Sequence, residues 1–148
     1  MQKGSLKFLA DEQISPVLIR ILNHVGEKAI LRFSSNFPNG TADEKWIPEA
    51  TRRGFVCVTY DRKMLMTESI APLFKKANAR VIFIGNHLAN VGCWDQALWM
   101  LKHWRKIRQR ATTMTPGELL RVHKNGRIVP VTAKSSARSE CPTTPNSN

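Results

Sequence analysis

The residues best suited to chemistry in this sequence are acidic side chains at three places along the chain. Asp11 and Glu12 follow a short apolar run, Asp43 and Glu44 follow a polar loop, and Asp61 follows a second apolar run. Carboxylate oxygens are the hard ligands that Mg²⁺ and Mn²⁺ prefer. Two such ions about 4 Å apart can activate a water, stabilise charge on a phosphodiester and assist the leaving oxygen. Asp11, Asp43 and Asp61 are therefore the candidate central metal ligands.

The same acids also have a purely structural interpretation. Asp43 and Glu44 at the start of a helix are favoured by the helix dipole alone, and Glu44 would complete a capping box with Thr41. An aspartate after a strand, such as Asp61, often caps a turn. Thr59 could hydrogen-bond a metal ligand or the attacking water, but it also fits as an ordinary strand residue. The joint placement of these acids in an otherwise basic protein favours the metal site.

The elements that must position these acids alternate between strands and helices. Apolar runs predict strands over residues 6–10, 29–33, 55–60 and 79–85, and helical spacing predicts helices over 15–25, 41–53, 67–78 and 94–110. This alternation predicts an α/β domain with a mainly parallel central sheet. Ligands of such sheets bind beyond the carboxyl ends of the strands, where Asp11 and Asp61 are expected to lie.

The last third of the chain has a different character. The helix over 94–110 is amphipathic, with one apolar side and one basic side. The predicted apolar side consists of Trp94, Ala97, Leu98, Leu101 and Trp104, and the predicted basic side of Lys102, Arg105, Lys106 and Arg110. Trp99 falls off the apolar stripe and is interpreted as a contact for a partner.

A hairpin and a tail complete the expected organisation. Residues 118–131 predict a small hairpin that turns at Asn125 and Gly126. From residue 132 onward the chain is rich in Ser, Thr, Pro and Asn, so we expect a disordered tail. One domain over residues 1–131, followed by a tail over 132–148, is the predicted organisation.

The net charge of the chain indicates which class of molecule it attracts. Lys and Arg number 23 against 11 Asp and Glu, a net charge of +12 over 148 residues. Such a field attracts polyanions, of which nucleic acid is the commonest, although an acidic protein or membrane surface also fits. Arg62 and Lys63 adjoin the acids and are candidate RNA contacts, together with the basic side of the 94–110 helix. A solvated helix face is the alternative for any one of those cations.

Several classes are disfavoured by the sequence. No apolar run resembles a secretory signal, and none approaches the about 18 residues of a membrane span. The three cysteines are widely separated, which argues against a zinc site, and Cys57 is expected to be a small buried hydrophobe. We therefore expect a cytoplasmic protein without membrane contact.

The order of three segments resembles the PIN-like domains related to VapC toxins. The segments are Phe-Leu-Ala-Asp-Glu at 8–12, Phe-Pro-Asn-Gly-Thr-Ala-Asp-Glu-Lys-Trp at 37–46 and Val-Thr-Tyr-Asp-Arg-Lys at 58–63. The similarity extends over about residues 6–131 and implies a three-layer α/β/α nuclease fold, here followed by a basic helix and a small hairpin. It also implies a Mg²⁺- or Mn²⁺-dependent endoribonuclease that acts as a toxin, is held in check by a cognate antitoxin and forms a homodimer.

The resemblance assigns roles to the acids. Asp11, Asp43 and Asp61 would be the central acids, and Glu12 and Glu44 neighbouring ligands. A further acid of PIN nucleases is not found directly after Asp61, where Arg62 and Lys63 stand, and Glu68 is the candidate to replace it. The competing hypothesis is therefore a catalytically inactive PIN-like module that binds RNA or another protein.

Overall fold

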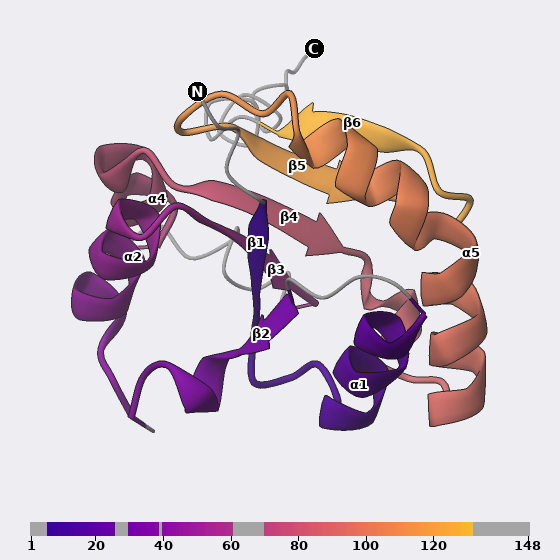
Figure 1. Cartoon of the computed structure of the whole chain (residues 1–148). Helices are drawn as coiled ribbons and strands as arrows, with labels where there is room; N and C mark the ends of the chain where they lie inside the picture. The colour runs from indigo at the N-terminus through magenta and orange to yellow at the C-terminus, as the bar shows by residue number, and fades with distance from the viewer. Residues whose placement is uncertain (1–5, 26–29, 39, 61–69, 132–148) are drawn as a thin grey trace, which may run out of the picture.

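The computed structural model of this chain describes residues 6–25, 30–38, 40–60 and 70–131, which form a six-stranded sheet between helices. The strands are β1 (Lys7–Ala10), β2 (Ile30–Arg32), β3 (Phe55–Thr59), β4 (Arg80–Ile84), β5 (Leu119–Val122) and β6 (Ile128–Val131). Their order is β2-β1-β3-β4-β5-β6 (Figure 1). All neighbours pair in parallel except β6, which runs antiparallel to β5. The sheet is therefore mainly parallel, as predicted.

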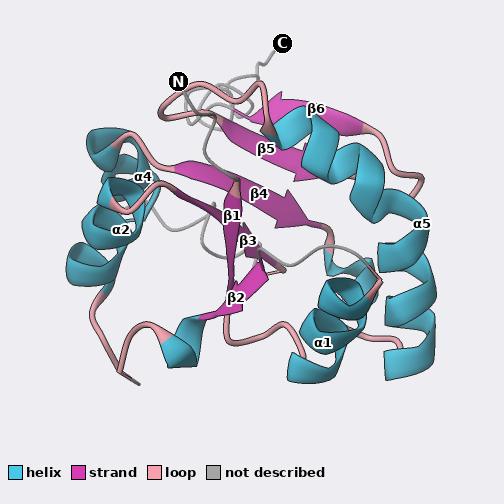
Figure 2. Cartoon of the chain, in the orientation of Figure 1, coloured by secondary structure: helices cyan, strands magenta, loops and turns pink. Residues whose placement is uncertain are grey.

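Helices cover both faces of this sheet (Figures 1 and 2). They are α1 (Pro16–His24), α2 (Asp43–Arg52), α4 (Ile70–Ala77) and α5 (Cys93–Ala111), with short 3₁₀ turns η1 (Phe33–Ser35) and η2 (Asn86–Leu88). Helices α1 and α5 pack on one face, and α2 and α4 on the other. The predicted three-layer α/β/α fold is confirmed.

The inner strands β1, β3, β4 and β5 are largely apolar because helices cover both faces of the sheet there. Successive strand residues point to opposite faces, so Phe8 joins the core beneath α1 and α5 while Leu9 joins the core beneath α2 and α4. Val56 and Cys57 divide in the same way. All five residues of β3 are buried, which makes β3 the central strand of the fold.

The connections diverge between β1 and β3. The chain leaves β1 through α1 on one face and reaches β2, whereas after β3 it continues to α4 on the opposite face and reaches β4. In open α/β sheets, ligands bind in the crevice at the point where the strand order switches in this way. The carboxyl ends of β1 and β3 are therefore the expected location of a ligand site in this fold.

The starts of the two helices near this edge differ from each other. The Ser15 side chain caps α1 by accepting a hydrogen bond from the Val17 N–H at 3.1 Å, and Pro16 occupies the first turn, as predicted. At α2 the expected capping box is wrong. Ala42 is the cap residue, and the Thr41 hydroxyl donates instead to the Pro38 carbonyl, where it closes a turn of the loop.

The predicted apolar side of the last helix is wrong by part of a turn. The buried residues of α5 are Met100, Trp104, Ile107 and Ala111, with Ala97 packed against them. Trp94, Leu98 and Leu101 are 78%, 54% and 43% exposed. The buried series keeps helical spacing to the end of α5, whereas the exposed series runs into Arg105 and Arg108. Burying that second series would desolvate the charges, so the helix turns it outward.

Trp99 faces the chain itself rather than a partner. Its indole N–H donates to the Lys124 carbonyl at 2.8 Å, and its ring packs between His87 and His103 with centroid distances of 5.2 and 4.6 Å. These contacts attach α5 to the predicted hairpin, which is confirmed with its turn at Asn125 and Gly126. Among the described residues, no helix combines the length and apolarity needed to cross a membrane.

Candidate active site

Asp11 stands at the carboxyl end of β1, directly at the switch in strand order. Its backbone N–H donates to the Val58 carbonyl at 3.0 Å, which extends the pairing of β1 and β3 by one residue. One carboxylate oxygen, Oδ1, accepts the Glu12 N–H at 2.8 Å, and the other, Oδ2, accepts the Thr59 hydroxyl at 2.8 Å. The carboxylate is therefore oriented by both its own turn and the neighbouring strand.

Thr59 is the last residue of β3 and is only 3% exposed. Burying a hydroxyl without a partner costs free energy, so a buried threonine normally hydrogen-bonds. Here the hydroxyl donates to Asp11 across the strand pair. Of the two roles that the sequence left open for Thr59, the structure favours the contact with a candidate metal ligand.

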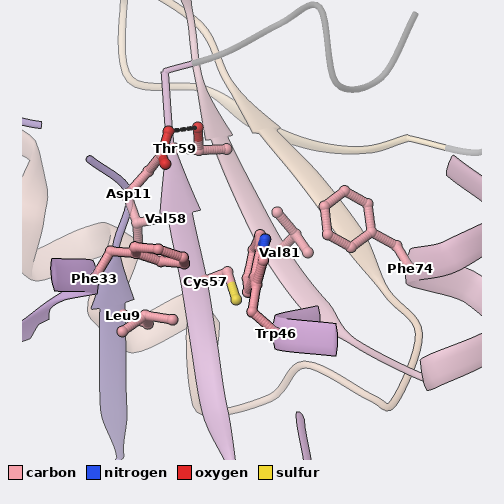
Figure 3. A pocket seen from close by; sticks show the side chains of 9 residues that line it. All are labelled: Leu9, Asp11, Phe33, Trp46, Cys57, Val58, Thr59, Phe74 and Val81. Carbon is pink, nitrogen blue, oxygen red and sulfur yellow. Dashed lines mark hydrogen bonds between the residues drawn. The ribbon is translucent and has the colours of Figure 1, made fainter. Parts of the chain in front are cut away.

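Apolar side chains form a narrow pocket beneath the Asp11–Thr59 pair. Figure 3 shows the two polar groups together at one end, joined by their hydrogen bond, with aromatic and aliphatic side chains along the rest of the pocket. The apolar lining consists of Leu9, Phe33, Trp46, Cys57, Val58, Phe74 and Val81. Only about 10 Å³ of this pocket is free. A pocket this small has little room for water, so the side of Asp11 that faces it is shielded from solvent.

Cys57 belongs to this apolar floor, as the sequence predicted. It is 6% exposed, and burial raises the pKa of its thiol to about 12. A neutral thiol contributes apolar surface and is a poor metal ligand, because the thiolate is the ligating form.

Asp43 is connected to the site through Trp46. Asp43 is the first residue of α2, and its Oδ1 accepts the indole N–H of Trp46 at 2.8 Å. The Trp46 ring in turn lies in the pocket floor, edge-on to Phe33 with 5.2 Å between ring centroids. Since α2 begins after the carboxyl end of β2, its first residue Asp43 lies toward the same edge of the sheet as Asp11, and Trp46 links it to the lining of the Asp11 pocket. Glu44, next to it, is exposed.

A second cavity opens on the other side of Asp11. It has a volume of about 160 Å³ and lies between the end of β1, the start of α1 and the end of β2. Asp11, Glu12, Arg32 and Ser34 provide its polar lining, and Ala10, Ile14, Pro16, Ile19 and Phe33 the rest. Glu12 therefore lines the same cavity as Asp11.

The donors at this edge fit Mg²⁺ or Mn²⁺ by their chemistry. Asp11, Glu12 and Thr59 offer carboxylate and hydroxyl oxygens, which are hard ligands. Within residues 6–25, 30–38, 40–60 and 70–131, no three His, Cys, Asp or Glu side chains gather in the arrangement of a metal site. Asp61 and Glu68 fall outside the described residues, and so do Arg62 and Lys63. Of the six candidate acids, the described residues therefore include Asp11, Glu12, Asp43 and Glu44.

Tyr60 follows the last residue of β3 and immediately precedes Asp61. Tyr60 is 3% exposed, and its hydroxyl donates to Gln96 Oε1 on α5 at 3.1 Å. Burial raises the pKa of this phenol above its ordinary value, so Tyr60 is neutral at physiological pH. Tyr60 therefore anchors the end of β3 to the helical layer.

The basic residues predicted to bind RNA on α5 lie toward the other edge of the sheet. Helix α5 starts after the carboxyl end of β4 and returns to the amino end of β5, as its course in Figure 1 shows. Lys102, Arg105, Lys106 and Arg110 are in its second half, and the helix rises about 1.5 Å per residue. The first three are exposed, whereas Arg110 pairs with Glu118 at 2.7 Å. Their contact with RNA stays a prediction.

Sequence reasoning missed two contributors to this edge. Arg32 lines the larger cavity, and Trp46 holds Asp43. A signal for Arg32 was present, since it is the last residue but one of the strand predicted over 29–33, at the same edge as Asp11. The role of Trp46 depends on the packing of α2 over the sheet, which residue spacing alone does not determine.

Comparison with known proteins gives one match. The model of a family described as PIN like domain matches residues 6–86, more than half of the chain. The matched segment runs from β1 through β4 and includes all six candidate acids: Asp11, Glu12, Asp43, Glu44, Asp61 and Glu68. Neither the curated proteins nor the solved structures gave a significant match.

Proposed function

This chain belongs to the PIN-like domain family, and we propose on that basis that it is a metal-dependent endoribonuclease. The observation that carries the proposal is the Asp11 carboxylate, which the Thr59 hydroxyl and the Glu12 N–H hold at the switch between β1 and β3. A carboxylate fixed in this place, within the segment that matches the family, is suited to bind a divalent cation next to a phosphodiester.

In this proposal Asp11, Asp43 and Asp61 hold the cation, with Glu12, Glu44 and Glu68 as further candidates. A bound Mg²⁺ or Mn²⁺ would lower the pKa of a water that it binds and would offset negative charge on the phosphate. The residues of the chain orient and restrict this chemistry. Thr59 fixes the Asp11 carboxylate, Trp46 fixes Asp43, and the apolar floor keeps bulk water from one side of Asp11.

The basic character of the chain supports RNA as the substrate. The net charge of +12 raises the local concentration of polyanions and speeds their encounter with the site. Arg62 and Lys63 follow Asp61 directly and are proposed to hold flanking phosphates, and the exposed cations of α5 to guide the RNA at longer range.

The decisive experiment is cleavage of a mixed cellular RNA pool by the purified chain with Mg²⁺, Mn²⁺ or EDTA. Defined fragments are expected with either metal and none with EDTA, because the proposed site relies on the cation to activate water and to offset charge on the phosphate. RNA that binds but is not cut under any metal condition would support the alternative, an inactive PIN-like RNA-binding or interaction module.

The finer assignment is a cytoplasmic toxin of a toxin–antitoxin pair, related to VapC. Its support is an exposed apolar stripe on α5, formed by Trp94, Leu98 and Leu101, which is unusual on the surface of a charged helix. Lys102, Arg105 and Arg108 adjoin this stripe, so an acidic amphipathic segment of an antitoxin complements it better than a second copy of this basic chain does. A homodimer through the same stripe is the other arrangement that the resemblance implies.

Leu98→Asp is expected to weaken antitoxin binding at least about tenfold, because it places a charge in the middle of the apolar stripe. The measurement is titration calorimetry with an acidic amphipathic helical peptide as the probe for the antitoxin segment. Gln109→Asp, at an exposed position of α5 outside the stripe, is the matched control and should bind normally. If light scattering instead finds a dimer of the chain alone that Leu98→Asp dissociates, the stripe belongs to a second copy.

A further inference from the structure

The cavity of about 160 Å³ beside Asp11 is larger than metal binding requires. A water molecule takes about 30 Å³ in the liquid, so the cavity has room for a group larger than a few waters. Its lining combines the polar side chains of Asp11, Glu12, Arg32 and Ser34 with apolar side chains from β1, α1 and their flanking turns. A concave site with apolar surface and a few placed polar groups is suited to bind a small ligand.

Arg32 is the cationic member of this lining, and its backbone is well fixed. Arg32 ends β2 in register with Ala10, the residue before Asp11. Its carbonyl accepts the Asn36 side-chain N–H at 2.9 Å, and the adjacent Phe33 is buried in the core. The backbone therefore delivers the guanidinium to the same edge of the sheet as the Asp11 carboxylate.

The guanidinium of Arg32 has no ion-pair partner among the described residues, although Asp11 and Glu12 line the same cavity. By contrast, Arg52, Arg53 and Arg110 all pair with glutamates. An arginine kept unpaired on the rim of a partly apolar cavity is suited to bind an external anion, and its planar fork matches a phosphate.

The walls restrict what that anion can be. Ile14 and Ile19 are 4% exposed and present an apolar surface to the cavity, which inorganic phosphate cannot use. A nucleotide unit carries both a phosphate for the guanidinium and an aromatic base for the apolar wall. It also tolerates the nearby acids, since its base and ribose have donors that carboxylates accept.

We propose that this cavity is a subsite for one nucleotide of the substrate, with Arg32 bound to its phosphate and the base against the wall formed by β1 and α1. The proposal rests on the proposed function only in taking RNA as the source of the nucleotide. If the chain cuts RNA as proposed, the occupant of this cavity flanks the bond to be cut, because the cavity adjoins Asp11, and Arg32 then sets the register of the RNA.

The test measures RNA binding in EDTA, where no metal-dependent cleavage takes place. A short labelled RNA is titrated by fluorescence anisotropy with wild type, Arg32→Ala, Arg32→Lys and the control Arg20→Ala. Arg20 is exposed on α1 and does not line the cavity, so its variant removes the same charge elsewhere. Arg32→Ala is expected to weaken binding about tenfold and to reduce the slope of log affinity against log salt by about 0.7, the value for one lost phosphate contact.

The remaining variants and a competition experiment test whether the guanidinium of Arg32 and the apolar wall both take part in binding. Arg32→Lys should retain the salt dependence but recover only part of the affinity, because an ammonium lacks the bidentate geometry. Arg20→Ala should resemble wild type. A nucleoside 5′-monophosphate should displace the RNA at lower concentration than inorganic phosphate does, and equal displacement would overturn the role of the apolar wall.

The outcomes separate this proposal from the nuclease proposal. If the wild type cuts RNA with metal but Arg32→Ala binds RNA as Arg20→Ala does, the subsite is wrong and the nuclease stands. If no metal supports cleavage while Arg32→Ala still loses affinity and salt slope, the subsite stands and the nuclease is wrong.

Discussion

Replacing Asp11 with asparagine is expected to lower the rate of metal-dependent RNA cleavage by at least about a hundredfold, on the scale of losing one electrostatic group at a reacting centre. The side chain keeps its shape but loses the negative charge that attracts the cation. An amide also has only one acceptor oxygen, whereas the carboxylate accepts from both the Thr59 hydroxyl and the Glu12 N–H. The variant therefore loses both charge and orientation.

The measurement is single-turnover cleavage of a defined RNA in Mn²⁺, with unfolding followed in parallel to show that the fold is intact. Asp95→Asn is the matched control, since Asp95 is an exposed aspartate in the first turn of α5 at the same edge of the sheet. It makes the same change in charge and should cut at close to the wild-type rate. An Asp11→Asn protein as fast as Asp95→Asn would remove Asp11 from the site.

The fold was predictable because local patterns and the sheet agree. Continuous apolar runs such as Phe55–Thr59 are typical of strands buried on both faces, and the end of the first such run correctly predicts the edge of the sheet at which Asp11 lies. The Ser15 cap and the Asn125–Gly126 turn are similarly local signals. Each depends on residues within a few positions of each other, so the sequence contains all of the relevant physics.

Errors arose where the answer depends on which surface another element covers. Helix α5 has two apolar stripes, and spacing alone favoured Trp94 and Leu98 over Met100 and Ile107. Packing against the sheet decides in favour of the second pair. Thr41 likewise satisfied the pattern of a capping box, but a turn of the preceding loop uses its hydroxyl. Patterns predict that a face is apolar more reliably than they predict its partner.

The site was predictable as a set of acids but not as a set of contacts. The spacing indicated Asp11 and Asp43 but not the bonds that hold them. The bond from Trp46 to Asp43 joins residues three positions apart in α2, and the bond from Thr59 to Asp11 joins two strand ends. The second of these spans 48 positions in the sequence, so only the parallel pairing of β1 and β3 brings its partners together.

Removing the hydrogen bond between Thr59 and Asp11 is expected to cause a large loss of Mn²⁺ affinity. Thr59→Val removes the hydroxyl and keeps the shape of the side chain, so Asp11 loses the donor that orients its Oδ2. Valine suits a buried strand position, and the fold should remain. Partners that orient metal-binding side chains contribute about 10- to 100-fold to metal affinity or activity, and we expect a loss of Mn²⁺ affinity in that range.

Thr59 is a positioning residue, because it acts on the cation only through Asp11. The experiment must distinguish this role from a contribution to the stability of the sheet. Mn²⁺ affinity is measured by calorimetry, and cleavage is followed as the Mn²⁺ concentration rises. The Thr59→Val enzyme should need more Mn²⁺ and should regain part of its rate at saturation, whereas Thr59→Ser, which restores the hydroxyl, should approach wild type. The control is Thr51→Val, which removes a hydroxyl that donates to the Ile47 carbonyl in α2, away from the site. If Thr59→Val and Thr51→Val have the same Mn²⁺ affinity as the wild type, the hydroxyl of Thr59 serves the sheet alone, and the orientation of Asp11 must come from its own turn.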